Sequence, residues 1–168
     1  STGSLGQGIS AACGMALGAK HAGKPINVYT IVGDGEVEEG ECWEAFMFAA
    51  HYGLSNLCVV LDRNHLQIDG TTETVMNSAP EEEKLKAFNF NVITIDGHDY
   101  DQIEAAMQVF HAETAKPTCI IMDTTKGKGV SYMTNSVHWH GKGPNADEYK
   151  SAIAELNAAY AALDQEEN

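Results

Sequence analysis

The chain has 168 residues, enough for one compact domain but few for two, and 43% of them are hydrophobic. A formal net charge of −14, from 24 acidic and 10 basic residues, argues against nucleic acid or a membrane surface as a partner, and no apolar run reaches the roughly 18 residues of a membrane span. The four cysteines (Cys13, Cys42, Cys58 and Cys119) form no CxxC pair and no signal peptide opens the sequence, so we expect reduced thiols and a cytoplasmic protein.

Short β-branched segments alternate with longer segments of helical period. The opening STGSLGQGIS is a glycine-rich loop with no element before it, so we expect the domain to extend upstream of Ser1. Helices are predicted at 8–20, 39–52, 79–88, 99–115 and 145–163, the last capped by Asn145, and strands at 26–32, 56–62, 91–96 and 118–124. This alternation predicts an α/β fold with a doubly wound, mostly parallel sheet, in one domain over 1–163 with a frayed tail at 164–168.

Glycine-containing loops follow all four predicted strands. In open parallel sheets, ligands bind at the carboxyl ends of the strands. The loops at these ends are GDGEVEEG (33–40), RNHLQIDGTTE (63–73), GHD (97–99) and KGKGVSYM (126–133). We therefore expect them to share one rim.

The Gly33-Asp34-Gly35 turn combines a hard oxygen ligand with backbone that a ligand can approach closely. This combination suits a diphosphate bridged to a divalent cation, although an ordinary turn capped by Asp34 remains an alternative. Asn64 lies thirty positions later, just past the next strand, where its side-chain amide can complete the same coordination sphere. The carbonyl of Leu66 can add a third oxygen.

A GDG turn followed by a helix, a strand and an Asn resembles the thiamine diphosphate binding motif. The segments GSLGQGIS, GDGEVEEGECWEAFMFAAHYGL, NLCVVLDRNHLQIDG, TTKGKGVSYM and HWHGKGPN resemble, in the same order, the N-terminal subunit of split-gene transketolases. The resemblance implies thiamine diphosphate and Mg²⁺ or Ca²⁺ as cofactors. It also implies a set of cofactor residues: Asp34, Asn64 and the Leu66 carbonyl on the metal, and Gly33, Gly35 and the Glu36 amide on the diphosphate.

Four further residues match the family at the thiazolium end of the cofactor. Gly3 and Leu5 match a loop along the cofactor, and Ile68 matches a residue that packs on the thiazolium ring. For Leu5 and Ile68 the alternative is a place in the hydrophobic core. His140 matches a histidine that reaches the diphosphate and the reacting centre, which implies a catalytic role, whereas an isolated loop histidine is otherwise solvated.

Five carboxylates near a diphosphate would repel it if all pointed inward. We expect Glu36, Glu38 and Glu41 to be solvated residues at a helix start, favoured by the helix dipole. Glu39 and Glu44 resemble glutamates at the family's subunit interface, and a solvated helix face is the alternative.

The resemblance implies a transketolase of the pentose phosphate pathway, which transfers a two-carbon ketol unit between sugar phosphates. The family places the glutamate that activates the cofactor on a pyrimidine-binding domain that this sequence lacks, and Arg63 is its single arginine. We therefore expect a partner, a C-terminal transketolase subunit, in a dimer of heterodimers. The alternatives are a 1-deoxyxylulose-phosphate synthase-like domain, a 2-oxo acid dehydrogenase α-type domain, or a non-catalytic truncated domain.

Overall fold

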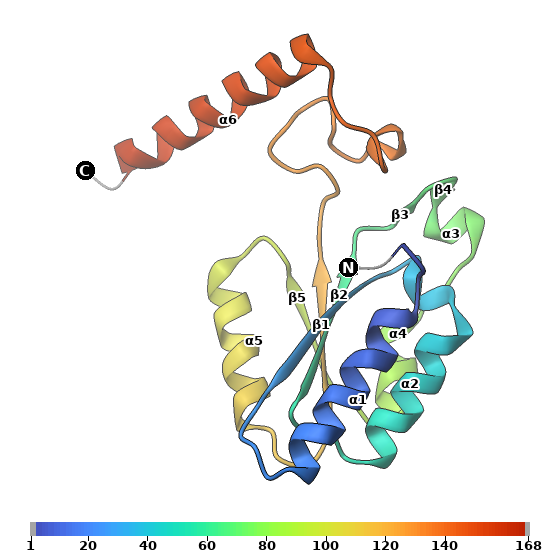
Figure 1. Ribbon diagram of the computed structural model, residues 1–168. Helices are drawn as coiled ribbons and strands as arrows, with labels where there is room; N and C mark the ends of the chain where they lie inside the picture. The colour runs from blue at the N-terminus through green and yellow to red at the C-terminus, as the bar shows by residue number, and fades with distance from the viewer. Residues whose placement is uncertain (1–2, 167–168) are drawn as a thin grey trace.

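The computed structural model describes residues 3–166 and places one parallel sheet at the centre (Figure 1). The sheet has four strands in the order β1-β2-β6-β5, and all three pairings are parallel. Its strands are β1 (Val28–Gly33), β2 (Leu57–Arg63), β5 (Asn91–Asp96) and β6 (Thr118–Asp123). A separate antiparallel hairpin of β3 (Leu66–Gln67) and β4 (Gly70–Thr71) follows β2.

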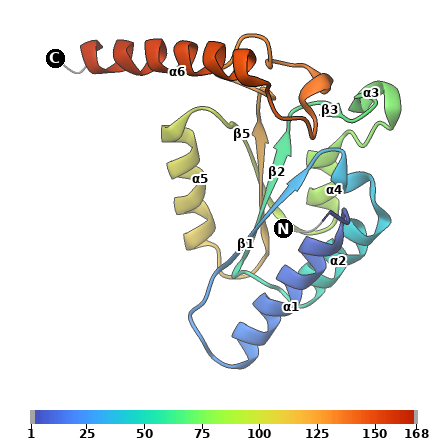
Figure 2. The same cartoon turned by 45° about the horizontal axis from the view of Figure 1, so that its top comes forward.

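Helices cover both faces of the sheet, which confirms the predicted α/β fold (Figures 1 and 2). The helices are α1 (Gln7–His21), α2 (Gly40–His51), α3 (Thr72–Val75), α4 (Glu81–Ala87), α5 (Tyr100–Ala112) and α6 (Ala146–Glu166), with short 3₁₀ turns η1 (Glu36–Glu38) and η2 (Val137–Trp139). Helices α1, α2 and α4 lie on one face and α5 lies on the other. None of the helices described in this range is long and apolar enough to cross a membrane.

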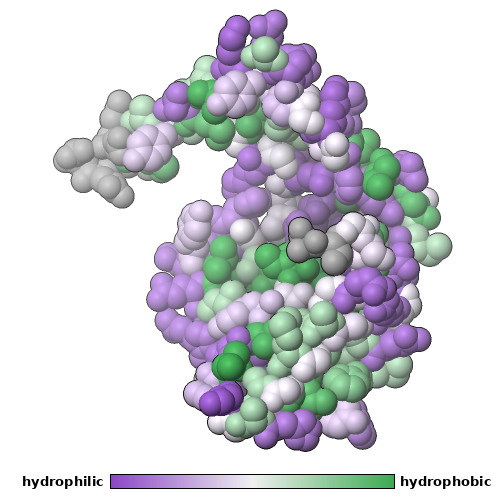
Figure 3. All heavy atoms as spheres, viewed as in Figure 1, coloured by the Kyte–Doolittle hydropathy of each residue, from purple (hydrophilic) through white to green (hydrophobic). Residues whose placement is uncertain are grey.

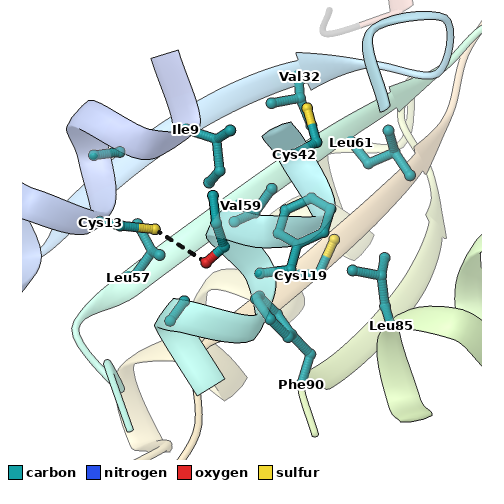
Figure 4. Packing of buried hydrophobic residues seen from close by; sticks show 14 of the residues in the cluster. Ile9, Cys13, Val32, Cys42, Leu57, Val59, Leu61, Leu85, Phe90 and Cys119 are labelled. Atoms are coloured by element: carbon teal, nitrogen blue, oxygen red, sulfur yellow. Dashed lines mark hydrogen bonds between the residues drawn. The ribbon is translucent and has the colours of Figure 1, made fainter. Parts of the chain in front are cut away.

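The two central strands carry most of the core. In β2 the residues Leu57 to Leu61 are all buried, as expected for a parallel strand covered on both faces. One cluster fills the space under α1, α2 and α4 and includes Phe46, Leu85 and Cys119 (Figure 4). A second cluster, which includes Phe110, lies under α5. Each fully buried large apolar side chain stabilises the fold by roughly 1.5–3 kcal/mol relative to an exposed one.

Two helix ends differ from the predicted ones by three residues, and the others by one or two. Helix α5 ends at Ala112 rather than at 115, because Glu113 adopts an extended backbone and its carboxylate accepts bonds from the amides of the next three residues. Helix α6 continues to Glu166 rather than ending at 163, while 167–168 lie outside the described residues, and the frayed tail stays a prediction. The predicted cap of α6 is confirmed, since Asn145 Oδ1 accepts bonds from the amides of Asp147 and Glu148, both at 3.0 Å.

The chain after β6 leaves the body of the domain as an arm, which we define as residues 126–166. Its hydrogen bonds run mainly within the arm: Ser131 donates through its amide and its hydroxyl to Glu155 (2.6 and 2.8 Å), and the Tyr132 hydroxyl donates to the Glu148 carbonyl (2.7 Å). Figure 3 shows open space between the outer part of α6 and the body.

Candidate functional site

Asp34 is the buried centre of the predicted rim, with only 1% of its surface exposed. Its amide donates to the Asp62 carbonyl at the end of β2 (3.1 Å). Its carboxylate accepts from the Gly35 amide at Oδ1 (2.9 Å) and from the His65 amide at Oδ2 (2.5 Å). Burial raises the pKa of Asp34, and these amides partly oppose that rise. The carboxylate therefore joins the first loop of the rim to the second.

The segment from Asn64 to Leu66 turns sharply beside Asp34. His65 adopts a left-handed backbone (φ 62°), which directs its amide to the Asp34 carboxylate. Asn64 Nδ2 donates to Asp62 Oδ2 (3.1 Å), and Asn64 Oδ1 accepts from the Leu66 amide (3.1 Å). The structure thus brings the loops of all three predicted metal ligands together.

The chemistry of these donors fits a hard divalent cation. One carboxylate, one amide oxygen and one carbonyl oxygen are the ligand types that Mg²⁺ and Ca²⁺ prefer, and Mg²⁺ commonly combines one or two carboxylates with phosphate oxygens. Over the described residues 3–166, no group of three or more His, Cys, Asp and Glu side chains could hold a metal. Mg²⁺ at such a site would commonly complete its coordination with water and phosphate oxygens.

Glu36 points inward, which corrects the prediction that it is solvated. Its carboxylate accepts from the Gly6 amide (3.0 Å) and from the Gly33 amide (3.2 Å), because both backbone donors face it. Glu38 and Glu41 are also half-buried and accept bonds from side chains of Gln67 (2.8 Å) and Gln7 (2.5 Å), respectively. The Gly33 amide, a predicted diphosphate donor, is thus already bonded to a carboxylate.

Two glycines at the rim sit where a side chain would not fit easily. A Cβ at Gly35 would lie 3.2 Å from the Gln67 Cβ. Gly6 has a φ of +82°, and a Cβ there would lie 3.3 Å from the Glu39 Cβ. The backbone of both loops therefore packs closely against its neighbours.

Leu5 and Ile68 are surface residues, so the core alternative is wrong for both. Leu5 is 53% exposed and Ile68 is 68% exposed, in the turn between β3 and β4. Gly3 is also exposed, and a Cβ there would meet no atom within 4 Å. Their contact with a cofactor stays a prediction.

His140 lies on the arm and is exposed. Its amide donates to the Val137 carbonyl (2.9 Å), and the indole of the preceding Trp139 donates to the Tyr132 carbonyl (3.0 Å). In the described part of the chain no hydrogen bond joins His140 to Asp34 or Asn64. The structure therefore shows no bond between this predicted catalytic residue and the metal ligands, and its role stays a prediction.

Hydrogen bonds continue across the rim to the other two strands. Asp62 Oδ1 accepts from the Thr124 hydroxyl at the end of β6. The next amide, of Thr125, donates to His98 Nε2 (2.8 Å), and the His98 amide donates to Asp96 Oδ1 (2.8 Å) at the end of β5. Together with the bonds of Asp34, they link the carboxyl ends of all four strands at one edge of the sheet. The fourth predicted loop, 126–133, begins at this edge and continues into the arm. Asp62 was not predicted from the sequence as a site residue, although its position two residues before Asn64 could have indicated it.

Arg63 is held by protein carboxylates. Its Nε and Nη2 donate to the two oxygens of Asp123 (2.6 and 2.9 Å), and Nη1 lies 3.8 Å from Glu81 Oε2. The Arg63 guanidinium lowers the pKa of Asp123. The guanidinium of this single arginine is thus bonded within the protein.

Glu39 and Glu44, the predicted interface glutamates, are both exposed. Glu44 lines a shallow groove between α1 and α2, together with Cys13 and Phe48. This exposure fits a subunit interface and a solvated helix face equally well, so the interface role stays a prediction.

Comparison with known proteins identifies the family. The family model for the thiamine diphosphate binding domain of transketolase matches residues 1–162. The chain therefore belongs to the transketolase family, as the motifs predicted.

Individual relatives agree with this assignment. The chain is 43% identical over 155 residues to the 6-deoxy-6-sulfo-D-fructose transketolase subunit SqwG of Clostridium sp. (strain MSTE9), which covers 92% of this chain and 56% of that one. It is 39% identical to an apulose-4-phosphate transketolase subunit of Phocaeicola vulgatus, covering 99% and 59%. The crystal structure of transketolase from Campylobacter jejuni superposes with a TM-score of 0.84 at 30% identity, covering 93% of this chain and 26% of that one. The chain thus spans little more than half the length of the two curated relatives.

Proposed function

We propose that this chain is the diphosphate-binding part of the N-terminal subunit of a thiamine diphosphate-dependent transketolase. One observation carries the proposal: the buried Asp34 carboxylate is bonded to the turn that bears Asn64 and Leu66, at the carboxyl ends of a parallel sheet. The transketolase family match gives this rim its cofactor class.

In this proposal, the rim holds the charged end of the cofactor. Asp34, Asn64 and the Leu66 carbonyl would bind Mg²⁺ or Ca²⁺, and the amides of Gly35 and Glu36 would face the diphosphate. The amide of Gly33 would join them once the Glu36 carboxylate releases it, since a diphosphate and this carboxylate compete for the same donor.

The remaining predicted residues would act at the other end of the cofactor. Bound thiamine diphosphate supplies the chemistry of ketol transfer through its thiazolium ring. The exposed Leu5 and Ile68 side chains would cover this ring, together with the Gly3 backbone. His140 would hold or move a proton at its imidazole during carbon–carbon bond cleavage.

We further propose a separate C-terminal subunit that carries the pyrimidine-binding domain, in a cytoplasmic dimer of heterodimers that acts on sugar phosphates. The names of the two curated relatives support a partner, because each is called a subunit of a transketolase. The pairing of Arg63 with Asp123 and Glu81 supports it as well, because a partner would then supply the arginines that bind a sugar phosphate.

A ketol-transfer assay tests the proposal. The chain would be assayed alone, mixed with a candidate partner subunit, and mixed with the partner in a form extended at its N-terminus. We expect no turnover from the chain alone and thiamine diphosphate-dependent turnover from a mixture. Full activity of the 168-residue chain by itself would contradict the partner requirement. Absence of thiamine diphosphate binding in every arm would contradict the function itself.

A further inference from the structure

Asp62 lies at the centre of the rim but belongs to none of the predicted ligand sets. It lies one residue before the end of β2 and pairs in register with Gly33 of β1, and its carbonyl accepts a hydrogen bond from the Asp34 amide. Its side chain is half-buried and both carboxylate oxygens are used: Oδ1 accepts from the Thr124 hydroxyl, and Oδ2 accepts from Asn64 Nδ2 at 3.1 Å. Three strand ends therefore meet at this residue.

Two hydrogen bonds fix which way the Asn64 amide faces: Nδ2 donates to Asp62, and Oδ1 accepts from the Leu66 amide. A side-chain amide has a donor end and an acceptor end of nearly the same shape, so packing alone does not choose between them. An ionised carboxylate only accepts hydrogen bonds, and it therefore requires the NH₂ group on its own side. The oxygen of Asn64 is then turned away from Asp62, where it already accepts from the Leu66 amide and has a second lone pair.

We propose that Asp62 is a positioning residue that orients the Asn64 amide so that its oxygen, and not its nitrogen, faces the metal. The inference rests on the proposed function, because it concerns the metal of that site. The Thr124 hydroxyl holds the other oxygen of Asp62 and so prevents the carboxylate from rotating. Groups that orient metal ligands in this way commonly contribute about 10–100-fold to metal affinity.

Two substitutions distinguish the effect of this hydrogen bond on metal binding from the effect of the Asp62 charge. Asp62→Asn removes the charge but keeps an oxygen for Asn64 Nδ2, because its new NH₂ group can donate to the Thr124 hydroxyl, which can also accept. Asp62→Leu removes both the charge and the bond at similar volume. Asp69→Asn, on the exposed turn of the β3–β4 hairpin, removes one charge nearby without touching Asn64 and serves as the matched control.

The readout is Mn²⁺ binding to the full chain in the presence of thiamine diphosphate, followed by electron paramagnetic resonance of free Mn²⁺. We expect Asp62→Leu to bind Mn²⁺ about 10–100-fold more weakly than the unsubstituted chain, and Asp62→Asn to recover about tenfold or more of that loss. Asp69→Asn should bind like the unsubstituted chain. Equal affinity of the Leu and Asn variants would overturn the positioning role, as would a Leu variant that binds like the unsubstituted chain.

A second measurement does not depend on whether Asp62→Leu folds. In the unsubstituted chain, the side-chain amide protons of Asn64 should exchange more slowly with solvent than those of Asn89, and Asp62→Asn should preserve this difference. Rapid exchange at Asn64 would overturn the inference. If the unsubstituted chain does not bind Mn²⁺ with thiamine diphosphate, the proposed metal site and the inference fail together, whereas failure of the Asp62 variants alone leaves the proposed function standing.

Discussion

The rim around Asp34 and the arm over residues 126–166 are held in different ways. At the rim, the buried Asp34 carboxylate accepts hydrogen bonds from backbone amides of two loops. The half-buried Asp62 carboxylate accepts a hydrogen bond from Thr124, at the end of the neighbouring strand. The arm bonds mainly to itself, and His140 on it is exposed. In the proposed site, this chain would therefore form most of the metal and diphosphate end, whereas the reacting end would depend on where the arm lies.

The apolar residues of helix α6 are also packed differently from those of the sheet. Tyr149, Ile153, Leu156, Tyr160 and Leu163 are all exposed and follow one another at spacings of four and three residues, which places them along one side of the helix. By comparison, the large apolar residues of β2 are covered on both faces. The arm therefore contributes less to the stability of the domain than the sheet and its helices.

The largest expected effect is the loss of unfolding free energy when a core residue of the body, rather than a residue of the arm, is truncated. Phe46 is 1% exposed and packs edge-to-face against Trp43 and Phe90, with ring centroids 5.5 Å away in each case. Phe46→Ala should lower the free energy of unfolding by about 3–5 kcal/mol because it leaves a cavity. Leu163→Ala, at a site 60% exposed on α6, should change it by less than about 0.5 kcal/mol. Urea unfolding followed by circular dichroism measures both, and similar losses would show that the arm is part of the core.

The next prediction concerns the buried carboxylate of the rim. Asp34→Ala should weaken metal-dependent binding of thiamine diphosphate by about 10²-fold or more, since a direct ligand should matter at least as much as the groups that orient it. Asp69→Ala, on the exposed turn of the β3–β4 hairpin, is the matched control and should bind normally. Calorimetric titration with and without Mg²⁺ measures the effect, and unchanged metal dependence in Asp34→Ala would show that the assignment is wrong.

On the arm, His140→Ala should lower turnover of the assembled enzyme by about 10²-fold, the usual scale for a positioned acid or base. Metal-dependent cofactor affinity should change little, because no hydrogen bond among the described residues joins His140 to the metal ligands. His138→Ala changes an exposed histidine of the same loop and should leave turnover near normal. Full activity of His140→Ala would reduce His140 to a loop residue.

The smallest effect concerns the thiols of the body. All four cysteines are free and buried. Burial raises the pKa of Cys13 to about 11 and the pKa values of Cys42 and Cys58 to about 12, and it also raises the pKa of Cys119. Because thiolate is the reactive form, native protein at pH 8 should react slowly with a thiol reagent and should react fully in urea. A rapidly labelled cysteine in the native protein would show local opening of the body.

The sheet and its rim were predictable because their signals are local. Runs of β-branched residues marked the strands, and parallel pairing then fixed the rim. The inward turn of Glu36 was not predictable, since a carboxylate at a helix start is usually solvated and only the fold brings the Gly6 and Gly33 amides to it. The role of Asp62 was not predictable for the same reason, because its partner Thr124 follows β6, which is far from β2 in sequence and is brought beside it only by the fold. The position of His140 depends on a long loop that has no periodic pattern.

We propose that this rim binds a divalent cation tightly only together with a diphosphate. The most direct measurement is the affinity of the full chain for Mn²⁺ with and without thiamine diphosphate. A site with one carboxylate should bind Mn²⁺ at least about tenfold more tightly when the diphosphate supplies the missing anionic oxygens. Equal Mn²⁺ affinity in the presence and absence of thiamine diphosphate would contradict the account.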